Sequence, residues 1–597
     1  MASWVACAEF QRITGEEAMK DYMNEYSRWL ACTAEDEKTN SELRNIGNDA
    51  EEIEERFYTE LEFGTAGLRG IIGAGTNRMN IYVVRRASAG LAKYLLNFKS
   101  AKTKGVAVAY DSRHYSKEFA EETACTLAAY GIKCYLYSTL HSVPQLSFTI
   151  REKNCMAGVV ITASHNPPEY NGYKVYWHHG GQVAPKQADE ILSCIRASDY
   201  FGTETVSLSD AVNSGLVEMI GEDVDEVYYK KTMSLMLRPE LVKEHGGDIA
   251  VVYTPLHGSG FVPVTNVLHR IGIKRLYTVP EQEQPNGSFP TVKAPNPEDP
   301  DAFTLASKLA DEVGADLILA TDPDSDRLGI DVRMENGSFR TLTGNQIGCI
   351  LIKYLLSTMK ELGTLPSNGL VVKSLVSTSL ADAICRSYGV TMRHVLTGFR
   401  FIAEQIDLAE ATGEFKFIFG FEESYGFLAG GYSHDKDAIC AAMLAAEAAV
   451  YYSTEGKTLY DVLNDIYAEY GFYIETTKSY TLSGKAGMEA IADTMEQLRK
   501  HPLPTVADEA VLSYEDILEG TKLYICSGET EKLNFPSSNV LRYNLFGDAW
   551  VIVRPSGTEP KLKLYVGAKA DTKEKAAERV KKLTSASDEV LSRYLYK

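Results

Sequence analysis

The stretch AGVVITASHNPP, residues 157–168, joins a short β-rich apolar run to a loop that carries a serine and a histidine. Similar runs, with helical stretches among them, recur at Gly105–Tyr110, Lys133–Tyr137, Asp248–Tyr253, Asp316–Ala320 and Gly369–Val372. Apolar runs of this length, interspersed with helices, are typical of buried strands in α/β layers. The sequence therefore predicts an α/β protein with ligand-binding loops after its strands.

The length of 597 residues predicts several domains, because a typical domain has about 150 residues. Breaks near Gly221, Gly337 and Gly471 suggest four. The expected domains are 1–221, 222–337, 338–470 and 471–597, and the last mixes strands and helices as an α+β domain. Residues 15–60 have helical periodicity and many acidic side chains, which predicts a packed N-terminal helical arm.

The composition excludes several classes of protein. The formal net charge of −20 argues against nucleic acid or an anionic membrane as a partner. No apolar run reaches 18 residues, and MASWVACAEF lacks the basic start of a signal peptide. Ten scattered cysteines without CxxC spacing predict neither a zinc site nor a dithiol centre. We expect a soluble, cytoplasmic protein.

Two loops carry distinctive chemistry. Ser164 lies in a loop with two prolines but lacks the GxSxG elbow of serine hydrolases, and alone the loop also fits a turn with a capping serine. The loop DPDSDR, residues 322–327, spaces three carboxylates two residues apart, which suits Mg²⁺ better than a solvated acidic turn. An EF-hand is excluded because Arg327 and Arg333 occupy its glycine and glutamate positions.

Two further loops offer polar groups for a phosphorylated sugar. GFEESYG, residues 420–426, follows the apolar run Phe415–Phe419 and is followed by HDKD, residues 434–437. Its acidic and hydroxyl groups suit paired sugar hydroxyls, although alone it also fits a helix-start cap. RPSGTEPK, residues 554–561, follows the run Trp550–Val553 and gathers an arginine, two hydroxyls and a glycine, as expected for an anion site, with a surface turn as the alternative. Together the four loops predict phosphoryl transfer on a phosphosugar.

These motifs, in this order, resemble the α-D-phosphohexomutase superfamily of phosphoglucomutases and phosphomannomutases. FGTAGLRG, residues 63–70, is similar to the opening motif of that superfamily, and the resemblance extends from Phe63 to the C-terminus. The nearest branch comprises the glucose-1,6-bisphosphate-dependent phosphoglucomutases beside the phosphopentomutases. The resemblance implies an α/β fold of four domains around a central cleft, three mixed α/β domains and a smaller C-terminal α+β domain.

The resemblance also implies a role for each matching residue. Ser164 would be the phosphorylated serine, and with Asp322, Asp324 and Asp326 it would hold Mg²⁺. Arg69 and Arg327 would stabilise the moving phosphoryl group, and His165 and Lys174 are alternatives for the general acid or base. The groups expected to bind substrate are Thr397, Gly398, Arg400, Glu422, Ser424, Lys436, Arg554, Ser556, Gly557 and Thr558.

The implied reaction interconverts glucose 1-phosphate and glucose 6-phosphate through a 1,6-bisphosphate intermediate, with Mg²⁺ as cofactor and glucose 1,6-bisphosphate as activator. Ser424 is retained, which favours glucose over pentose phosphate, whereas Phe421 replaces a glycine that many relatives carry. Phosphopentomutase, phosphomannomutase and sugar-bisphosphate synthase are alternatives. A non-catalytic sensor or scaffold is disfavoured because Ser164 and all three aspartates are present, and a phosphatase because no motif supplies a water-activating base. The protein is expected as a monomer or homodimer.

Overall fold

The structure is a computed structural model that describes residues 22–64, 67–482, 484–556 and 560–596. The chain forms two compact units. The first comprises Met1–Leu235, Ala250–Leu328 and Tyr432–Met443. The second comprises Met236–Ile249, Gly329–Gly431 and Leu444–Lys597. Each unit therefore contains segments that are distant in the sequence.

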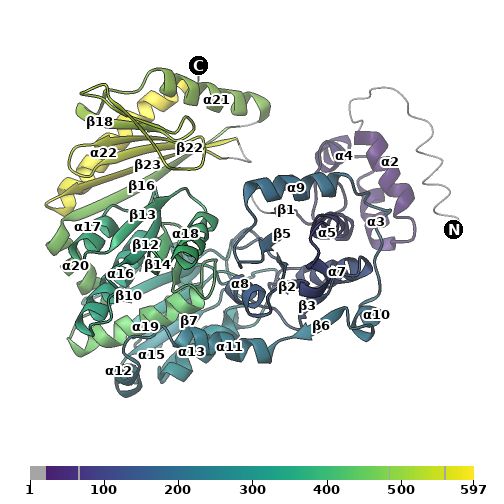
Figure 1. Ribbon diagram of the computed structural model, residues 1–597, viewed down its shortest axis with the longest axis horizontal. Helices are drawn as coiled ribbons and strands as arrows, with labels where there is room; N and C mark the ends of the chain where they lie inside the picture. Colours follow the sequence, from purple (N-terminus) through teal and green to yellow (C-terminus); the bar gives the residue numbers. More distant parts are fainter. Residues whose placement is uncertain (1–21, 65–66, 483, 557–559, 597) are drawn as a thin grey trace. The chain divides into compact units, whose positions relative to one another are not determined.

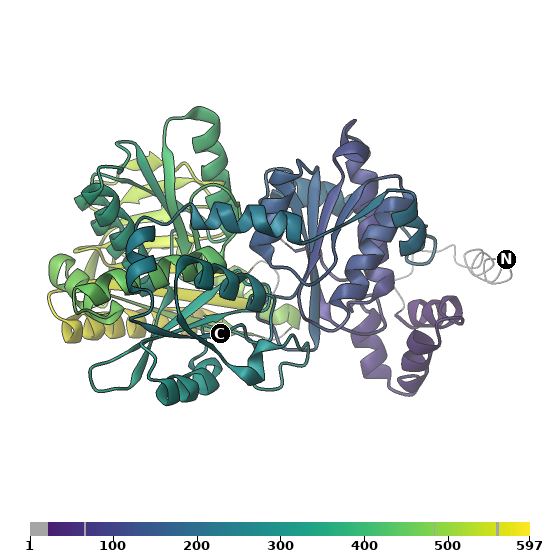
Figure 2. The ribbon, with the colours of Figure 1, turned by 90° about the horizontal axis from the view of Figure 1, so that it is seen from below.

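The described part of the first unit begins with three short helices, α2 (Tyr22–Cys32), α3 (Glu37–Asn45) and α4 (Ala50–Phe57). Figure 2 shows them in purple, gathered at one side of that unit. Asp36 and Asp49 cap α3 and α4 by accepting backbone N–H groups, which ends the connecting turns. Trp29 is fully buried and packs edge-on against Phe57 and Phe201. The predicted helical arm is thus confirmed from residue 22 onward.

A six-stranded sheet forms the centre of this unit, in the order β1-β5-β4-β2-β3-β6. Strands β4, β2, β3 and β6 pair in parallel, whereas β5 runs antiparallel to both of its neighbours, β4 and β1. Figure 1 shows helices α5 and α7 on one face and α8 on the other. The strands are β1 (Gly67–Ile71), β2 (Val106–Tyr110), β3 (Cys134–Tyr137), β4 (Ala157–Ile161), β5 (Tyr170–Trp177) and β6 (Val217–Ile220). The helices are α5 (Ile81–Leu95), α6 (Ala101–Lys104), α7 (Ser116–Ala129), α8 (Val143–Glu152), α9 (Pro185–Arg196), α10 (Leu208–Asn213) and α11 (Glu222–Met233).

A second set of parallel strands completes the first unit, with β7 paired to both β8 and β9. All five residues of β7 and of β9 are buried, as expected for strands covered on both faces. The elements are β7 (Ala250–Thr254), α13 (Phe261–Ile271), β8 (Arg275–Thr278), α14 (Pro280–Glu283), η1 (Pro300–Phe303), α15 (Thr304–Val313) and β9 (Leu317–Thr321). The aspartate loop follows β9 directly.

The second unit contains a four-stranded sheet of order β13-β12-β14-β15, in which β15 is antiparallel to β14 and the other pairs are parallel. Helix α19 (Ala438–Thr454) begins in the first unit and ends in the second. The strands of this sheet are β12 (Gly369–Ser374), β13 (Thr391–Val395), β14 (Lys416–Glu422) and β15 (Gly426–Ala429). Outside this sheet, β10 (Leu328–Arg333) pairs antiparallel with β11 (Phe339–Leu342). The helices are α12 (Pro239–His245), α16 (Gly344–Glu361), α17 (Leu380–Ser387), α18 (Phe399–Thr412) and α20 (Leu459–Tyr470).

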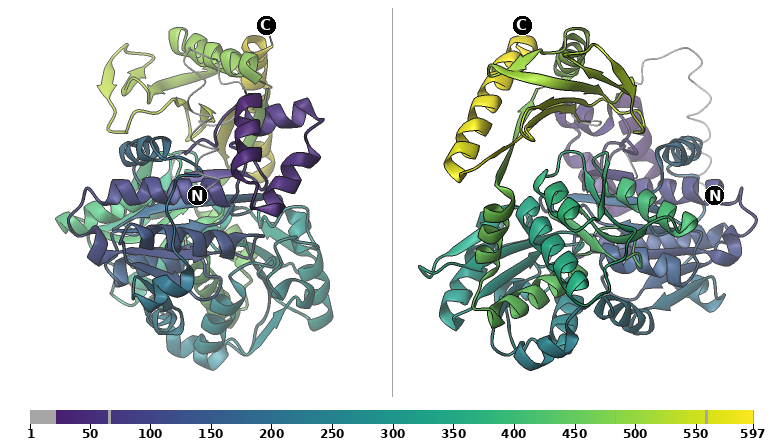
Figure 3. Two further views of the ribbon diagram at one scale, coloured as in Figure 1. Left: turned by 90° about the vertical axis from the view of Figure 1, so that its right-hand side faces the viewer. Right: turned by 60° about the vertical axis from the view of Figure 1, so that its left-hand side comes forward.

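The C-terminal part of the second unit is an eight-stranded antiparallel sheet of order β16-β23-β22-β21-β18-β19-β20, with β17 paired to β18. Helix α22 lies along one face of this sheet, drawn in yellow in Figure 3. The strands are β16 (Phe472–Thr481), β17 (Thr505–Val506), β18 (Glu509–Asp516), β19 (Thr521–Tyr524), β20 (Thr530–Lys532), β21 (Leu541–Leu545), β22 (Trp550–Pro555) and β23 (Lys561–Ala570). The helices are α21 (Gly484–Lys500) and α22 (Lys573–Leu595).

Most of the expected elements are confirmed. Each apolar run named above forms a strand whose ends lie within a few residues of the expected ones. Gly337 lies in the turn between β10 and β11, and the three boundaries between the four expected domains remain predictions. No helix in the described part of the chain is long and apolar enough to cross a membrane. No disulfide joins the cysteines at described positions.

A buried glutamate stabilises the start of α12. Glu447 on α19 is fully buried, and its Oε1 accepts the backbone N–H groups of Leu237 at 2.8 Å and Arg238 at 2.6 Å. The Arg238 guanidinium lies 4.2 Å from the centre of the Tyr451 ring. Burial raises the pKa of Glu447 to about 7, although the two N–H groups favour its ionised form.

This pKa predicts a pH-dependent difference in stability between the protein and its Glu447→Gln variant. Between about pH 4.5 and 7 the folded state holds a proton that the unfolded state has lost, so rising pH destabilises the fold through this residue. Glutamine keeps the acceptor oxygen but does not ionise. Urea unfolding should show similar stabilities at pH 4 and a variant more stable at pH 8, by an amount on the order of 3 kcal/mol. A constant difference across this range would contradict the assignment.

Candidate functional site

Ser164 lies immediately beyond the carboxyl end of β4, in a loop that exposes almost none of it. Its backbone has a positive φ of 52°, which is uncommon for a residue other than glycine. The Ser164 N–H donates to Thr162 Oγ1 at 2.8 Å, and the Ser164 hydroxyl donates to Asp322 Oδ2 at 2.8 Å. His165 Nδ1 lies 3.2 Å from the same hydroxyl oxygen. The serine is therefore held in one strained conformation that directs Oγ toward the aspartate loop.

Arg113, which the sequence analysis did not single out, fixes the backbone of this loop. Its guanidinium donates to the carbonyl oxygens of Ser164 at 2.6 Å, Pro167 at 2.8 Å and Tyr170 at 3.0 Å, and it also bonds the Asn166 carbonyl. A second buried side chain, Asp111, pairs with Arg113 at 3.4 Å. The planar fork of arginine can serve several carbonyl oxygens at once, which an ammonium group cannot do with the same geometry.

The three aspartates of the DPDSDR loop converge. One carboxylate oxygen from each of Asp322, Asp324 and Asp326 lies within 4.8 Å of the others, and all three side chains are buried. Asp322 Oδ1 accepts the N–H groups of Asp326 at 3.1 Å and Arg327 at 3.0 Å. Oδ1 of Asp324 and Oδ1 of Asp326 are buried and accept no hydrogen bond from a described residue. Unsatisfied carboxylate oxygens at this spacing fit a small divalent cation with oxygen ligands.

The pKa values of these three carboxyl groups are shifted in different directions. Burial and the neighbouring carboxylates raise the pKa of Asp322 well above its ordinary value, and they also raise that of Asp326. Burial alone would raise the pKa of Asp324 too, but Lys174 holds it below its ordinary value. Such a cluster is stable only when cations lie close to it.

Basic side chains surround the three aspartates. Lys174 Nζ donates to Asp324 Oδ2 at 2.8 Å, and Lys436 Nζ lies 3.1 Å from Asp326 Oδ2. Arg327 is almost buried and forms an ion pair with Glu298. Burial, together with the charges of Arg327 and Arg69, lowers the pKa of His165 to about 2, so the imidazole is neutral at physiological pH.

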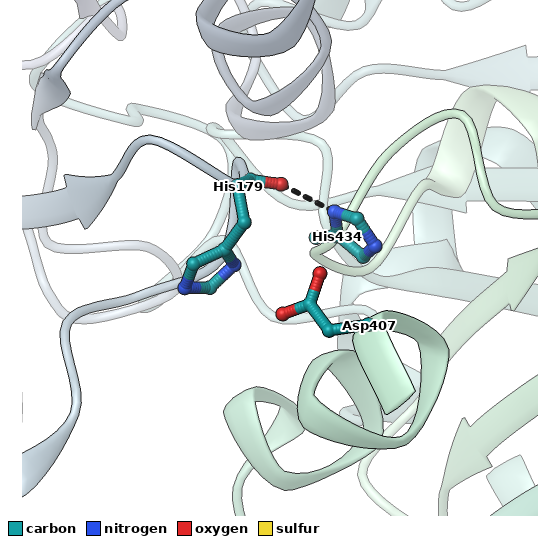
Figure 4. A group of neighbouring side chains, drawn as sticks. All are labelled: His179, Asp407 and His434. Atoms are coloured by element: carbon teal, nitrogen blue, oxygen red, sulfur yellow. Dashed lines mark hydrogen bonds between the residues drawn. The ribbon is translucent and has the colours of Figure 1, made fainter. Parts of the chain in front are cut away.

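Hydrogen bonds join the HDKD segment, residues 434–437, to other parts of the first unit. Asp435 Oδ2 accepts the Tyr176 hydroxyl at 2.8 Å, and Asp435 Oδ1 accepts Lys436 Nζ at 2.9 Å. The His434 N–H donates to Ser147 Oγ at 2.9 Å, and the His434 ring donates through Nδ1 to the carbonyl oxygen of His179, as Figure 4 shows. These contacts place Lys436 beside the aspartates, a position that its motif did not reveal.

The backbone of the aspartate loop has its own supports. Ser259 donates through both its N–H and its hydroxyl to the Pro323 carbonyl oxygen, each at 2.8 Å. Gly258 approaches so closely that a Cβ atom there would lie 2.4 Å from Pro323 Cα. Val143 N–H donates to the Asp324 carbonyl oxygen at 2.9 Å. The segment PLHGSG, residues 255–260, which follows β7, is the only sequence feature that could have indicated Gly258 and Ser259 as supports of the loop.

Glu422 ends β14 in the second unit. It is buried, and its Oε1 accepts the Gly398 N–H at 2.7 Å. Thr397 Oγ1 is buried and has no hydrogen-bond partner among the described residues, while the Arg400 guanidinium lies 4.7 Å from the centre of the Phe401 ring. Ser424 lies in the half-buried turn between β14 and β15. The structure thus brings Gly398 and Glu422 together.

Phe421 is a core residue. It is fully buried and stacks on Phe419, with ring centres 6.2 Å apart. A Cβ atom on Gly348 would lie 2.6 Å from the Phe421 ring, so the ring fits only because residue 348 is glycine. The larger side chain at position 421 is accommodated by α16.

Arg554 lies near the end of β22, and its Nη2 donates to the Tyr565 hydroxyl at 3.1 Å. The neighbouring Ser556 N–H donates to the Lys561 carbonyl oxygen at 2.7 Å. Gly557 and Thr558 lie outside the described residues. Arg69, on β1 in the first unit, is exposed and donates to Asn166 Oδ1 at 3.0 Å. One cluster in the first unit is formed by the three aspartates together with Ser164, His165, Lys174, Arg327 and Lys436.

Comparison with known families decides the assignment. Four models match in order: phosphoglucomutase/phosphomannomutase alpha/beta/alpha domain I at residues 60–201, domain II at 226–334, domain III at 343–470, and the C-terminal domain at 531–583. The chain belongs to the phosphoglucomutase/phosphomannomutase family. The four-domain architecture, with three mixed α/β domains and a β-rich C-terminal domain, is therefore confirmed.

Individual relatives agree with this assignment. A phosphoglucomutase of Staphylococcus saprophyticus is 37% identical over 516 residues, which cover 86% of this chain and 92% of that protein. A phosphoglucomutase of Staphylococcus aureus is 36% identical over 551 residues, covering 91% and 96%. The open form of the Paramecium phosphoglucomutase parafusin has the same fold, with a TM-score of 0.65, 16% identity and coverage of 90% and 97%. Membership of this family implies a small phosphosugar as substrate.

The contacts of Arg113 predict that Arg113→Met strongly destabilises the phosphohexomutase fold. The substitution leaves Asp111 buried without its cation and releases the loop carbonyl oxygens, and loss of one partner of a buried ion pair costs about 3–5 kcal/mol. Urea unfolding measures the loss. Arg275→Met is the control, because Arg275 is exposed and the change should stay within about 0.5 kcal/mol. Equal midpoints for the two variants would show that Arg113 does not support the loop.

Proposed function

We propose that this chain is a phosphoglucomutase that interconverts glucose 1-phosphate and glucose 6-phosphate through a phosphorylated Ser164. The observation that carries the proposal is the position of Ser164 Oγ, 2.8 Å from Asp322 in a buried cluster of three aspartates. The names of the relatives at 36–37% identity support glucose phosphate as the substrate. Mannose and pentose phosphates, and synthesis of a sugar bisphosphate, are the alternatives.

The residues suggest how the reaction proceeds. Phosphorylated Ser164 gives its phosphoryl group to the free hydroxyl of a hexose phosphate, so that the serine O–P bond breaks and a sugar O–P bond forms. The hydroxyl proton passes to His165, or to Lys174 after that lysine has lost its own proton, because an ammonium group cannot accept one. The bisphosphate then returns its other phosphoryl group to Ser164 Oγ, and the alcohol that leaves takes up a proton. No water is consumed, so the products balance as an isomerisation.

Asp322, Asp324, Asp326 and the Ser164 phosphate are the proposed ligands of Mg²⁺. The unsatisfied oxygens of Asp324 and Asp326 support this choice. A cation bound there would neutralise negative charge on the moving phosphoryl group. Arg327 and Arg69 supply further positive charge in this proposal, and Lys174 and Lys436 hold the carboxylates in place.

The substrate-binding residues are assigned to the second unit and to Lys436. Glu422 and Ser424 accept or donate hydrogen bonds to sugar hydroxyls, assisted by Thr397, Gly398 and Arg400. Arg554 and Ser556, with Gly557 and Thr558, bind the phosphate that is not transferred. Glucose 1,6-bisphosphate is proposed as the activator, because it can phosphorylate a serine that has lost its phosphate.

Phosphorus NMR tests the function directly. The purified protein receives Mg²⁺ and a trace of glucose 1,6-bisphosphate, with glucose, mannose or ribose 1-phosphate in separate tubes. We expect glucose 1-phosphate to give the 6-phosphate fastest, and EDTA to stop the conversion. Ser164→Ala should convert none of the three esters. Faster conversion of ribose or mannose phosphate would replace the proposed substrate, and release of inorganic phosphate alone would indicate a phosphatase.

A further inference from the structure

The hairpin turn between β14 and β15 holds two adjacent glutamates in different environments. Glu422 accepts the Gly398 N–H, as described above. Glu423 follows in the turn, and Tyr425, two residues later, has a left-handed backbone with φ of 65°. The turn also lies against the start of α16, where a Cβ atom on Gly344 would lie 2.2 Å from the Glu423 carbonyl oxygen. The turn therefore has little freedom on that side.

Two buried serines hold the Glu423 side chain. Its Oε2 accepts the Ser374 hydroxyl at 2.9 Å and the Ser377 hydroxyl at 3.2 Å. The Glu423 N–H donates to Ser377 Oγ at 3.1 Å, so Ser377 contacts both the backbone and the carboxylate of one residue. Both serines are almost completely buried at the end of β12 and in the loop after it.

The two serines also contact each other. The hydroxyl oxygens of Ser374 and Ser377 lie 2.9 Å apart, so each serine contacts both the other serine and the Glu423 carboxyl group. Ser377 Oγ can accept the Glu423 N–H at the same time, because a hydroxyl oxygen has two lone pairs. These mutual hydrogen bonds hold the turn at this position.

A buried lysine fixes the loop that carries these serines. Lys373 Nζ donates to the carbonyl oxygens of Ser377 and Thr378, each at 2.9 Å, and it lies 2.9 Å from Asp382 Oδ2. The Thr378 N–H donates to Asn345 Oδ1 at 3.1 Å. Lys373 is 1% exposed, so its ammonium group interacts with these loop atoms and not with solvent. The hydrogen bonds from Ser374 and Ser377 to Glu423, called the serine clamp below, are thus part of a rigid assembly on β12 and α16.

We propose that Glu423 is a positioning residue that sets the orientation of the sugar-binding turn, through its clamp by Ser374 and Ser377. Glu422 and Ser424, on either side of it, are the groups proposed to bind sugar hydroxyls, and this inference rests on that proposed function. Rotation of the turn by even a small amount would misplace both groups. The clamp therefore determines how well the protein distinguishes a sugar phosphate from an analogue that lacks one ring hydroxyl.

Steady-state kinetics of Glu423→Ala tests the inference, with glucose 1-phosphate and its 2-, 3- and 4-deoxy derivatives as substrates. We expect KM for glucose 1-phosphate to rise about tenfold with a smaller change in kcat, because the clamp acts on binding. The preference for glucose over the least favoured deoxy sugar should fall by a similar factor. Glu423→Gln, which keeps one acceptor oxygen, should lie between the two proteins. Glu414→Ala, an exposed carboxylate before β14, is the matched control and should match the parent.

A double-mutant cycle separates positioning from a general effect on the fold. Ser377→Ala should raise KM by itself, but adding it to Glu423→Ala should add little, since both changes remove one clamp. Full additivity, or a Glu423→Ala variant that keeps the parent's KM and sugar preference, would overturn the inference. So would a parent protein that does not discriminate among the deoxy sugars. If the parent converts no sugar phosphate at all, the proposed function fails, which the phosphorus NMR experiment shows independently.

Discussion

Repulsion among Asp322, Asp324 and Asp326 is the constraint on which the first unit's site depends. Three buried carboxylates within 4.8 Å are unfavourable unless positive charge lies among them. Lys174 and Lys436 supply it from β5 and from the segment before α19. These ion pairs stabilise the contact between elements that are far apart in the sequence. The same arrangement leaves two carboxylate oxygens available for a metal ion.

The position of the Ser164 and aspartate loops depends on rigid backbone as well as on charge. Ser164 and Ser325 both have positive φ angles, of 52° and 54°, and neither is glycine. Arg113 holds the first of these loops by its carbonyl oxygens, and Gly258 and Ser259 hold the second. Strained backbone of this kind persists only when neighbouring groups over-determine it, and it places Ser164 Oγ against Asp322 before any substrate binds. Much of the positioning needed for phosphoryl transfer is thus built into the fold.

The sequence predicts the cluster of Ser164 and the aspartates better than it predicts the residues that support this cluster. Short apolar runs located the strands, and the motifs after them indicated Ser164 and the aspartates as a candidate site, because ligand-binding residues follow strand ends in α/β folds. Arg113 and Glu423 were missed as supports, since the loop carbonyl oxygens that Arg113 binds and the serines that bind Glu423 lie at least 51 and 46 residues away along the chain. The ion pairs of Lys436 with Asp326 and Asp435 were not predicted either. Such pairings follow from tertiary packing, which no local pattern records.

The covalent phosphate on Ser164 is the claim that the whole account requires. The most direct test is to incubate the protein with glucose 1,6-bisphosphate and Mg²⁺, digest it, and locate the phosphate by mass spectrometry of the peptides. The account predicts phosphate on the peptide that contains Ser164, and exchange of that phosphate for the isotopically labelled phosphate of an added hexose phosphate. Phosphate on another residue, or none on Ser164 while sugar phosphate is being converted, would contradict it.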